Sequence, residues 1–415
     1  MTQERTTAGP LGGVKVLDLS WFGAGPIAGR ALASAGADVI KVETVKRIDG
    51  LRAMAPRQRG ARGYNVSGYF NNYNADKRSV TIDLTTERGH ELSLVLVRWA
   101  DVMLTNMTNR AVGQVGMDWE TVSRENPRLV AAYMPMMGTT GRFKDFQGFG
   151  AMLTAICGMN YLAGFEENRP VGVGTNYPDY VVNPIHAYIA ILAGLRHARK
   201  TGEGQMIDVS QYESSVAAMS LPLFQHVNGG GEYVRAGNRV PYAAPHGAYR
   251  VQDAAERSDR WVALACLTEA HWQAFTAEVC GYPEWGDDDR FRTLAGRLAN
   301  QDDLDQLIAG WAAEQNGADL VHRLQRADIP AGIVQDAREV IEDAQLAEHG
   351  YFVPLEHAEA GLRLYDGPGW RMSESPVSLR RAAPMLGEHT FEVAQDLLGL
   401  SPDEIANLVA DGVLQ

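Results

Sequence analysis

The order of apolar and polar positions in the first half of the chain predicts alternating strands and helices. Residues 13–20, GVKVLDLS, are rich in apolar and β-branched side chains and end in small ones, which is typical of a buried strand. Residues 26–36, PIAGRALASAG, have the spacing of a packed helix, and residues 37–43, ADVIKVE, form a second strand. A strand, a helix and a strand within about 30 residues make a βαβ unit, which belongs to a parallel sheet.

The alternation continues beyond this first unit. Further strands are predicted at 79–84, 101–106 and 128–135, with a helix over 87–99 between the first two. Parallel strands are normally buried on both faces by the helices that connect them. The first half of the chain therefore predicts an α/β fold built on a doubly wound parallel sheet.

The middle of the chain places a carboxylate in front of an unusually apolar run. Asp179 lies in the stretch YPDYVVNP, and the residues IHAYIAILAGL that follow predict a long helix from about Val181. Gly202 is well placed to end that helix, a strand follows within 200–210, and another helix is predicted from Gln211. The α/β pattern thus extends past residue 210.

Composition changes at 226–247, where three consecutive glycines and two prolines interrupt regular structure and indicate a linker. Residues 260–336 then alternate short strands with helices, and Ser401 is predicted to cap a final helix. The predicted organisation is a large α/β domain at 1–215, a linker at 216–245, a smaller α+β domain at 246–336, and a further linker with the C-terminal segment at 337–415.

Composition and charge exclude several classes of protein. The 415 residues are 45% hydrophobic, which suffices for a large core. No apolar run reaches the about 18 residues of a membrane span, and the start, MTQERTTAGPLGG, lacks the plan of a secretory signal, so we expect a cytoplasmic protein without membrane contact. Cys157, Cys266 and Cys280 lack metal-binding spacing, which predicts reduced thiols and no metal. A net charge of −13 argues against binding to nucleic acid.

The loop after the first strand is a weak nucleotide-binding signal. GAGP at 23–26 follows that strand, and Glu43 ends the second strand, where an acid could bind a ribose. The glycine spacing is not GxGxxG, and Pro26 lacks an N–H that could hold a pyrophosphate. A nicotinamide-dependent oxidoreductase is therefore a minor alternative, and a loop shaped for close packing or for another nucleotide is favoured.

Asp179 has two readings from the residues themselves. A carboxylate close before a helix is held ionised by the unpaired N–H groups and by the helix dipole, and its ordinary role would be to cap that helix. The apolar helix beyond it indicates a central position, where an ionised carboxylate in a partly dry environment would be a nucleophile or base. The local pattern leaves both roles open.

End to end, the chain resembles the family III CoA-transferases, which include formyl-CoA transferase, carnitine and benzylsuccinate CoA-transferases and the acyl-CoA racemases. The resemblance rests on motifs in a fixed order, namely PLGGVKVLDLS with AGP and GADVIKVE, DKRSVTIDL, ADVMLTN, ENPRLV, RKTGEGQMIDVSQYES, RAGN, IPAGIV and APMLGEHTFEV. It covers essentially the whole chain. It implies that the segment at 337–415 returns to the large domain and that two chains form an interlocked dimer.

The resemblance also implies a reaction. Asp179 matches the family's nucleophilic aspartate, which exchanges coenzyme A between two carboxylic acids through an aspartyl anhydride and an aspartyl-CoA thioester. Acyl-CoA is then a substrate, a carboxylic acid is the acceptor, and no tightly bound cofactor is expected. The positions that correspond to CoA contacts are Phe22, Gly23, Ala24, Leu84, Thr85, Asn106, Met107 and Thr108. Lys41, Lys77 and Arg78 are nearby cations that either face the CoA phosphates or are solvated surface charges.

Departures from the family pattern narrow the reaction. Formyl-CoA transferases carry a glutamine where this chain has Gly23, which argues against formate or oxalate as substrate. They carry an arginine where this chain has Gln114, which leaves phosphate binding to other residues. Racemases carry a His-Asp pair where this chain has Phe149 and Gly150, so proton exchange between two bases is not supported. Intramolecular CoA transfer by an isomerase, and a non-catalytic subunit of a heteromer, remain alternatives.

Overall fold

Six parallel strands in the order β3-β2-β1-β4-β5-β6 form the central sheet, so the predicted α/β fold is confirmed. The computed structural model of the chain describes residues 9–57, 60–252 and 259–415. The strands are β1 Lys15–Asp18, β2 Asp38–Glu43, β3 Arg78–Thr81, β4 Val102–Thr105, β5 Val130–Tyr133 and β6 Gln205–Asp208.

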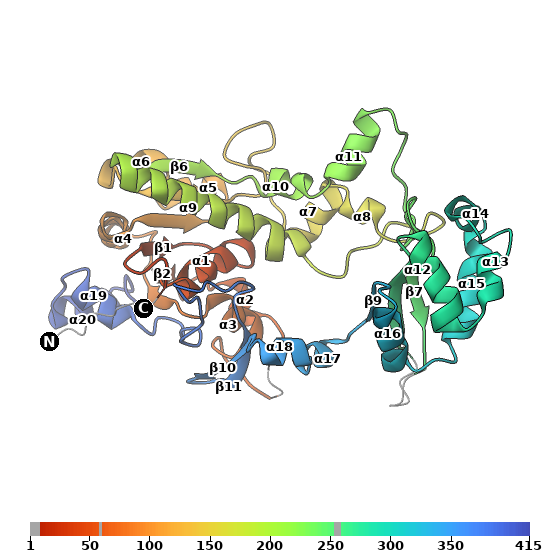
Figure 1. Cartoon of the computed structure of the whole chain (residues 1–415). Helices are drawn as coiled ribbons and strands as arrows, with labels where there is room; N and C mark the ends of the chain where they lie inside the picture. Colours follow the sequence, from red (N-terminus) through yellow and green to blue (C-terminus); the bar gives the residue numbers. More distant parts are fainter. Residues whose placement is uncertain (1–8, 58–59, 253–258) are drawn as a thin grey trace. The chain divides into compact units, whose positions relative to one another are not determined.

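Helices cover both faces of this sheet, because successive strand residues point to opposite sides (Figure 1). Val16 and Val39 pack with α1, Ala24–Ser34, and α9, Asn183–Thr201, on one face. Leu17 and Ile40 face the other side, where the core includes residues of several further helices. Those helices are α4 Glu87–Trp99, α5 Asn109–Gln114, α6 Trp119–Glu125, α19 Thr390–Asp396 and α20 Pro402–Ala410.

The predicted helix boundaries differ in accuracy. Helix α4 spans the predicted residues, with Thr86 as N-cap. Helix α9 begins two residues later than predicted but ends at Gly202 in the left-handed conformation, with φ 83°, as its composition indicated. Helix α20 has the predicted Ser401 cap, completed by Glu404 in a capping box. Gly202 and Ser401 therefore mark their helix ends correctly, whereas the start of α9 was predicted two residues too early.

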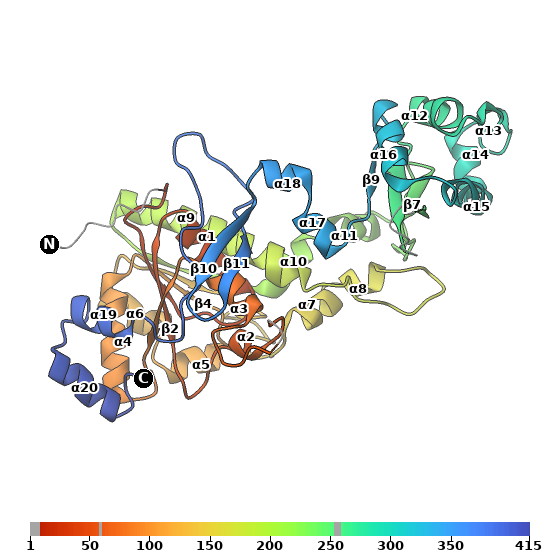
Figure 2. The ribbon, with the colours of Figure 1, turned by 90° about the horizontal axis from the view of Figure 1, so that it is seen from below.

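The C-terminal segment packs against β3, the strand at one edge of the sheet. The Ser79 carbonyl accepts a hydrogen bond from the His389 N–H at 2.9 Å, and Thr390 Oγ1 accepts one from the Thr81 N–H at 3.0 Å. Ile82 also bridges Leu414. Figures 1 and 2 both place α19 and α20 beside α4. The segment thus supplies partners for edge-strand groups that would otherwise be unpaired.

Several shorter elements belong to the same unit, although the end residues Leu162 of α8 and Ala344 of α18 fall in the smaller unit. The hairpin of β10, Phe352–His357, and β11, Gly361–Asp366, is antiparallel, and Tyr365 packs with Ala75. The remaining elements are α2 Gly50–Ala53, α3 Gly68–Asn74, α7 Gly150–Ile156, α8 Met159–Leu162, the π-helical turn η1 Pro178–Val182, α10 Gln211–Ala217, α11 Ser220–Val227 and α18 Ala344–Glu348.

The second unit has its own sheet and core. Strands β7, β8 and β9 are antiparallel neighbours, and Val262 and Leu264 of β8 pack against Trp272 and Phe275. Its elements are β7 His246–Arg250, β8 Trp261–Ala265, α12 Glu269–Ala274, the π-helix η2 Phe275–Cys280, α13 Pro283–Asp287, α14 Leu294–Ala299, α15 Gln301–Ala312, α16 Gly317–Arg326, β9 Ala331–Ile333 and α17 Ala337–Ile341.

The two units differ from the predicted domains in their boundaries. The larger unit comprises 1–161, 172–233 and 345–415, and the smaller comprises 162–171 and 234–344. The segment 162–171 joins the smaller unit through a bridge between Phe165 and Ala236, a pairing that local composition cannot reveal. The predicted linker also contains helix α11.

The predictions about a secretory signal, membrane spans and cysteines concern the whole chain. Residues 1–8, which carried part of the argument against a secretory signal, lie outside the described residues. Within the residues described, no helix combines the length and the apolar character needed to cross a membrane. Cys157 and Cys266 are buried and Cys280 is half-buried, and all three are free thiols.

Candidate active site

Asp179 lies in the π-helical turn η1, which leads directly into α9. No side chain caps either helix, so Asp179 does not have the capping role that its position allowed. The Gly150 backbone N–H and the Asn183 side chain instead act on its carboxylate as nearby donors, and both lower its pKa. π-Helical turns are frequent at functional sites, because the extra residue breaks the regular register of the helix.

Burial dominates the electrostatics of this carboxylate. It raises the pKa of Asp179 from 3.8 to about 6, and the hydrogen bonds from Gly150 and Asn183 offset only part of the shift. The helix dipole favours the ionised form, but lost hydration outweighs it here. At pH 7 a group with this pKa is still roughly 90% ionised. The site therefore contains a poorly solvated carboxylate that is mostly charged.

Two glycines allow other segments to approach Asp179 closely. A Cβ built on Gly150 would lie 2.7 Å from Asp179 Cγ, far inside van der Waals contact, so any side chain there would displace the carboxylate. A Cβ on Gly23 would lie 3.4 Å from Asp179 Cβ, which places the loop after β1 directly beside the carboxylate. Gly150 was noted in the sequence only as a departure from the racemases. Its contact with Asp179 depends on tertiary structure.

Aromatic rings surround the same carboxylate. Tyr180 lies with its ring centroid 5.7 Å from that of Tyr73 and 6.0 Å from that of Tyr69, and Phe22 meets Phe149 edge to face at 5.4 Å. Burial, together with the nearby Asp366 carboxylate, raises the pKa of Tyr73 to about 12, so this side chain is a neutral phenol. None of the three tyrosines was identified from the sequence.

The loop that contains Phe22, Gly23 and Ala24 is held in place by Asn106. Asn106 Oδ1 accepts a hydrogen bond from the Trp21 N–H at 2.7 Å, and Asn106 Nδ2 donates one to the Trp21 carbonyl at 2.6 Å. Phe22 has a positive φ of 59°, which is rare for an aromatic residue and marks a sharply turned loop. The structure thus brings four predicted CoA contacts together at the carboxyl ends of β1 and β4.

The other predicted contacts lie at the same edge of the sheet. Thr85 bonds to Asp83 Oδ1 at 2.6 Å after β3, and Thr108 accepts a hydrogen bond from the Ala111 N–H at the start of α5. Leu84 and Met107 pack partly against the core. Because parallel strands end at a common edge, residues that follow β1, β3 and β4 converge although they are distant in sequence.

The three cations named from the sequence have internal partners. Lys77 Nζ donates to Asp18 Oδ2 at 2.7 Å, to the Pro26 carbonyl at 2.9 Å and to Asn74 Oδ1 at 2.9 Å. These bonds use all three of its donors, and the side chain is fully buried, so Lys77 is neither a solvated charge nor placed to hold a phosphate. Burial lowers the pKa of Lys77 to about 8, which leaves it protonated at neutral pH.

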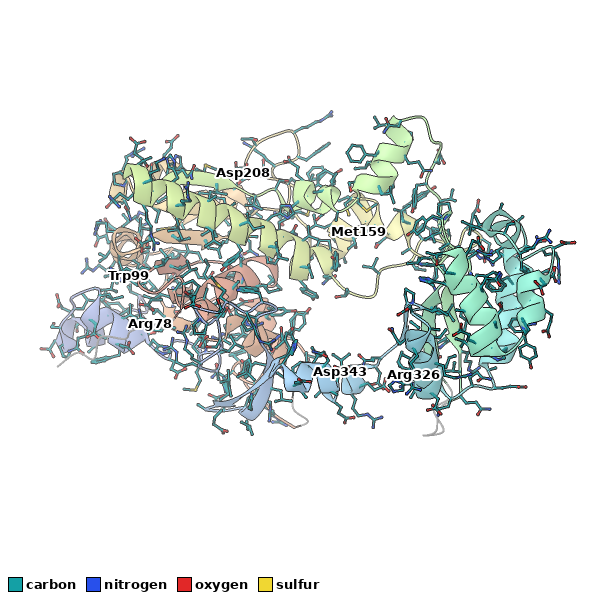
Figure 3. All side chains as sticks on the ribbon, viewed as in Figure 1. Arg78, Trp99, Met159, Asp208, Arg326 and Asp343 are labelled. Carbon is teal, nitrogen blue, oxygen red and sulfur yellow. The ribbon has the colours of Figure 1, made fainter. Side chains whose placement is uncertain are left out.

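Lys41 and Arg78 also form ion pairs within the protein. Lys41 Nζ donates to the Ser20 carbonyl at 2.5 Å and pairs with Asp49 at 3.2 Å, with both side chains fully buried. Arg78, labelled in Figure 3, pairs with Asp38 at 2.6 Å and with Glu392 of α19 at 3.3 Å. A solvated surface position is therefore wrong for Lys41, and Arg78 joins β2, β3 and the C-terminal segment.

Glu43 does not serve the minor nicotinamide alternative. Its carboxylate receives two hydrogen bonds from Arg52, at 2.8 and 2.7 Å, and one from Ser79 Oγ at 2.7 Å. A ribose hydroxyl would have to displace these buried partners. In the described part of the chain, no group of three or more His, Cys, Asp or Glu side chains is arranged to hold a metal ion.

Comparison with known proteins identifies the family. The family model described as CoA-transferase family III matches residues 11–390. The chain belongs to CoA-transferase family III. The assignment made from the sequence motifs is confirmed, and the protein is an enzyme of the CoA-transferase class.

Several characterised family III CoA-transferases align over nearly the full length. Succinate–glutarate CoA-transferase of Agrobacterium fabrum is 31% identical, over 96% of this chain and 98% of the relative. Formyl-CoA:oxalate CoA-transferase of Streptomyces avermitilis is 31% identical, over 97% and 99%. The crystal structure of a CaiB/BaiF family protein from Brucella suis is 28% identical, has a TM-score of 0.83 and covers 94% of this chain and 100% of that one.

The raised pKa of Asp179 predicts a trade-off between activity and stability. An acid whose folded pKa is raised is destabilising when ionised, so the penalty grows from pH 3.8 to pH 6 and is complete above that. We expect Asp179→Asn to stabilise the fold at pH 7.5 by about 2 kcal/mol, after allowing for partial exposure. Thermal melting at pH 7.5 and at pH 5 measures this, and the gain in Tm should shrink at pH 5.

Asp396→Asn is the control, because it makes the same substitution at an exposed carboxylate at the end of α19. Its melting temperature should follow the wild type at both pH values. An Asp179→Asn protein that melts at or below the wild-type temperature at pH 7.5 would show that its carboxylate carries no desolvation penalty.

Proposed function

We propose that this CoA-transferase moves coenzyme A from an acyl-CoA thioester to a second carboxylic acid through covalent intermediates on Asp179. The observation that carries the proposal is the placement of the Asp179 carboxylate against Gly150 and Gly23, beside the loop with the predicted CoA contacts. Asp179 attacks the thioester carbonyl and CoA thiolate leaves, which gives a mixed anhydride. The thiolate then attacks Asp179 Cγ, the first acid leaves, and an aspartyl-CoA thioester remains. The incoming acid reverses these steps.

The environment of Asp179 suits this chemistry. A carboxylate with a pKa of about 6 is ionised at neutral pH yet poorly hydrated, so less water must be removed before it attacks. Both intermediates would hydrolyse in free contact with water. The burial that raises the pKa of Asp179 limits that contact.

We propose dicarboxylic acids as one class of substrate. The names of the relatives specify succinate and glutarate, succinyl-CoA and D-citramalate, succinyl-CoA and L-malate, and formyl-CoA and oxalate. Formyl-CoA and oxalate are less favoured, because Gly23 replaces the glutamine of those enzymes. Succinyl-CoA is therefore the first donor to test.

Alternative reactions have less support. A racemase needs a second acid/base group, and Phe149 and Gly150 offer none in the place of the racemase pair. An isomerase would use the same Asp179 and differs only in needing no separate acceptor. The reading as a non-catalytic subunit is opposed by Asp179 itself, whose setting is built from Gly150, Asn183 and Gly23. A cytoplasmic location stays a prediction from the sequence.

Replacing Asp179 should remove the reaction without loss of the fold. We expect Asp179→Ala to lower transfer from succinyl-CoA to an acid acceptor by at least about 10⁴-fold, because no covalent intermediate can form. Wild-type protein incubated with succinyl-CoA and then reduced with borohydride should carry its modification on the peptide that contains residue 179. Intact-protein mass spectrometry and peptide mapping measure both.

Two results would contradict Asp179 as the nucleophile. Turnover by Asp179→Ala at more than a few per cent of wild-type activity, or a modified peptide elsewhere in the wild type, would contradict the assigned nucleophile. Turnover without any second acid would indicate the isomerase. Wild-type activity should also decline below about pH 6, as Asp179 becomes protonated.

We propose that Arg47 binds a CoA phosphate in place of the buried cations. Arg47 follows β2 at the carboxyl edge of the sheet, and its guanidinium lies 5.1 Å from the centroid of the Trp21 ring. The side chain is exposed, and among the residues that the structure describes no carboxylate pairs with it. Trp21 belongs to the loop held by Asn106, so Arg47 lies close to the other predicted contacts.

A pair of variants separates phosphate binding from structural support. Arg47→Ala should raise the KM for acyl-CoA about tenfold with little change in Tm, because it removes a charged hydrogen-bond donor. Lys77→Met should leave Asp18 buried without its partner and destabilise the fold by about 3–5 kcal/mol. Steady-state kinetics and melting curves measure the two. Arg199→Ala, which removes a cation in the last turn of α9, is the control. A normal KM in Arg47→Ala would overturn its role.

We propose that the protein is an interlocked homodimer. On α11 the side chains of Leu221, Phe224 and Val227 are 64%, 64% and 78% exposed, and Ile185 and Ile189 of α9 are exposed as well. Apolar side chains gathered on helices in this way usually meet another protein surface. Some relatives are named as α and β subunits, but retention of Asp179 favours two identical, competent chains.

Subunit exchange tests the interlocked arrangement. Light scattering should give twice the 45.3 kDa of one chain. Two differently tagged versions should form mixed dimers when co-expressed but not when mixed after purification, because threaded chains cannot separate without unfolding. A monomer would refute the dimer, and rapid exchange between purified dimers would refute the interlocking.

A further inference from the structure

Asn183 is a fully buried amide next to Asp179 that the mechanism has not yet used. It is the first residue of α9 and lies four positions after Asp179, so both side chains lie on one side of the helix. Its Nδ2 donates to Gln211 Oε1 at 3.1 Å, and its Oδ1 accepts a hydrogen bond from Ser214 Oγ at 2.6 Å. These partners fix which way the amide points.

Gln211 fixes the orientation of the Asn183 amide. Gln211 Nε2 donates to the Met134 carbonyl at 2.6 Å, so Gln211 must present its oxygen to Asn183. Asn183 in turn must present its nitrogen to Gln211 and its oxygen to Ser214. The second N–H of Asn183 is not used by Gln211, and the Asn183 side chain acts on Asp179 as a donor that lowers its pKa. The network therefore delivers a hydrogen-bond donor, not an acceptor, to the carboxylate.

Gly150 supplies a second donor to the same carboxyl group. Gly150 approaches so closely that a Cβ there would lie 2.7 Å from Asp179 Cγ, and its backbone N–H lowers the pKa of Asp179. Two donors from different segments thus meet at one carboxyl group. Asp179 lies inside the turn η1, and its carboxylate caps neither η1 nor α9. The two donors are therefore not explained by helix capping.

We propose that the Asn183 side-chain amide, together with the Gly150 N–H, stabilises the oxyanion that forms on the Asp179 carboxyl group during CoA transfer. This inference rests on the proposed role of Asp179 as nucleophile. When CoA thiolate attacks Asp179 Cγ, a C–S bond forms and the electron pair of the C=O bond moves to the Asp179 oxygen. That pair re-forms the C=O bond as the C–O bond to the substrate carboxylate breaks, and the first acid leaves.

The two stages of the reaction make different demands on these donors. In the first stage the negative charge develops on the substrate carbonyl, and hydrogen bonds to Asp179 weaken the nucleophile. In the second stage, and again when the acceptor acid attacks the thioester, the charge develops on the Asp179 oxygen itself. Fixed donors at that oxygen stabilise those transition states. Asn183 should therefore speed formation and breakdown of the aspartyl-CoA thioester.

A purely structural role is the competing explanation. Asn183 joins α9 to α10 through Gln211 and Ser214, so its loss could act only by loosening these helices. Ser215 provides a matched control, because its Oγ bonds mainly to the Gln211 carbonyl, at 2.6 Å, and lies 3.4 Å from Asn183 Oδ1. Ser215→Ala disturbs the same helix junction and leaves both donors to Asp179 in place.

Single-turnover experiments with succinyl-CoA test the role of Asn183. Quenched samples are analysed by intact-protein mass spectrometry for the CoA thioester on Asp179. We expect Asn183→Ala to slow its appearance about 100-fold, the usual effect of removing one oxyanion donor, while the Kd for CoA stays within a factor of two. The Asn183 bond lowers the pKa of Asp179, so the acid limb of kcat/KM should move above pH 6. Ser215→Ala should match the wild type in both.

Each outcome decides the inference. If Asn183→Ala and Ser215→Ala label Asp179 at the same rate and share one acid limb, Asn183 is structural and the inference is wrong. If Asn183→Ala does not fold, Asn183→Leu, which is uncharged and of similar volume but lacks the donor, decides by the same two readouts. Absence of any label on Asp179 in the wild type would instead refute the proposed function, which separates the two failures.

Discussion

The buried ion pair between Asp18 and Lys77 sets the position of the loop on which the site is built. Asp18 ends β1, and Lys77 reaches it at 2.7 Å while also donating to the Pro26 carbonyl in α1. Burial alone would raise the pKa of Asp18, but the Lys77 and Lys41 ammonium groups outweigh it and hold the pKa below its usual value. Both charges are fully buried, so neither can move to water without leaving the other unpaired.

Two further buried pairs extend this support. Lys41 pairs with Asp49, whose other oxygen accepts a hydrogen bond from the Phe22 N–H at 3.2 Å, and Arg52 pairs with Glu43 at 2.7 Å. With three acids and three bases, this cluster carries no net charge. The loop from Trp21 to Ala24 is thereby held from both sides, which keeps Gly23 against Asp179. Rigid support of this kind is what a site that must exclude water requires.

Asp179 occupies the opposite situation, since no cation pairs with it in the described residues. Its pKa rises because burial removes water and only two neutral donors replace it. The same protein thus uses fully compensated carboxylates for structure and an incompletely compensated one at the site. The difference is physical: a paired carboxylate is stable and unreactive, whereas one with little hydration and no counter-ion attacks readily.

The amino-acid sequence by itself determined the α/β pattern, the βαβ start, helix α4, the end of α9 at Gly202 and, through its motifs, the family and the importance of Asp179. These depend on local periodicity, on capping residues and on motifs of fixed order, all of which are readable along the chain. Only the tertiary structure decided which charges are buried, that Gly150 and Asn183 both donate to Asp179, and that 162–171 belongs to the second unit. Charge burial and donor geometry arise from contacts between residues far apart in the sequence, such as Asp18 and Lys77, which are 59 positions apart, and no local pattern encodes them.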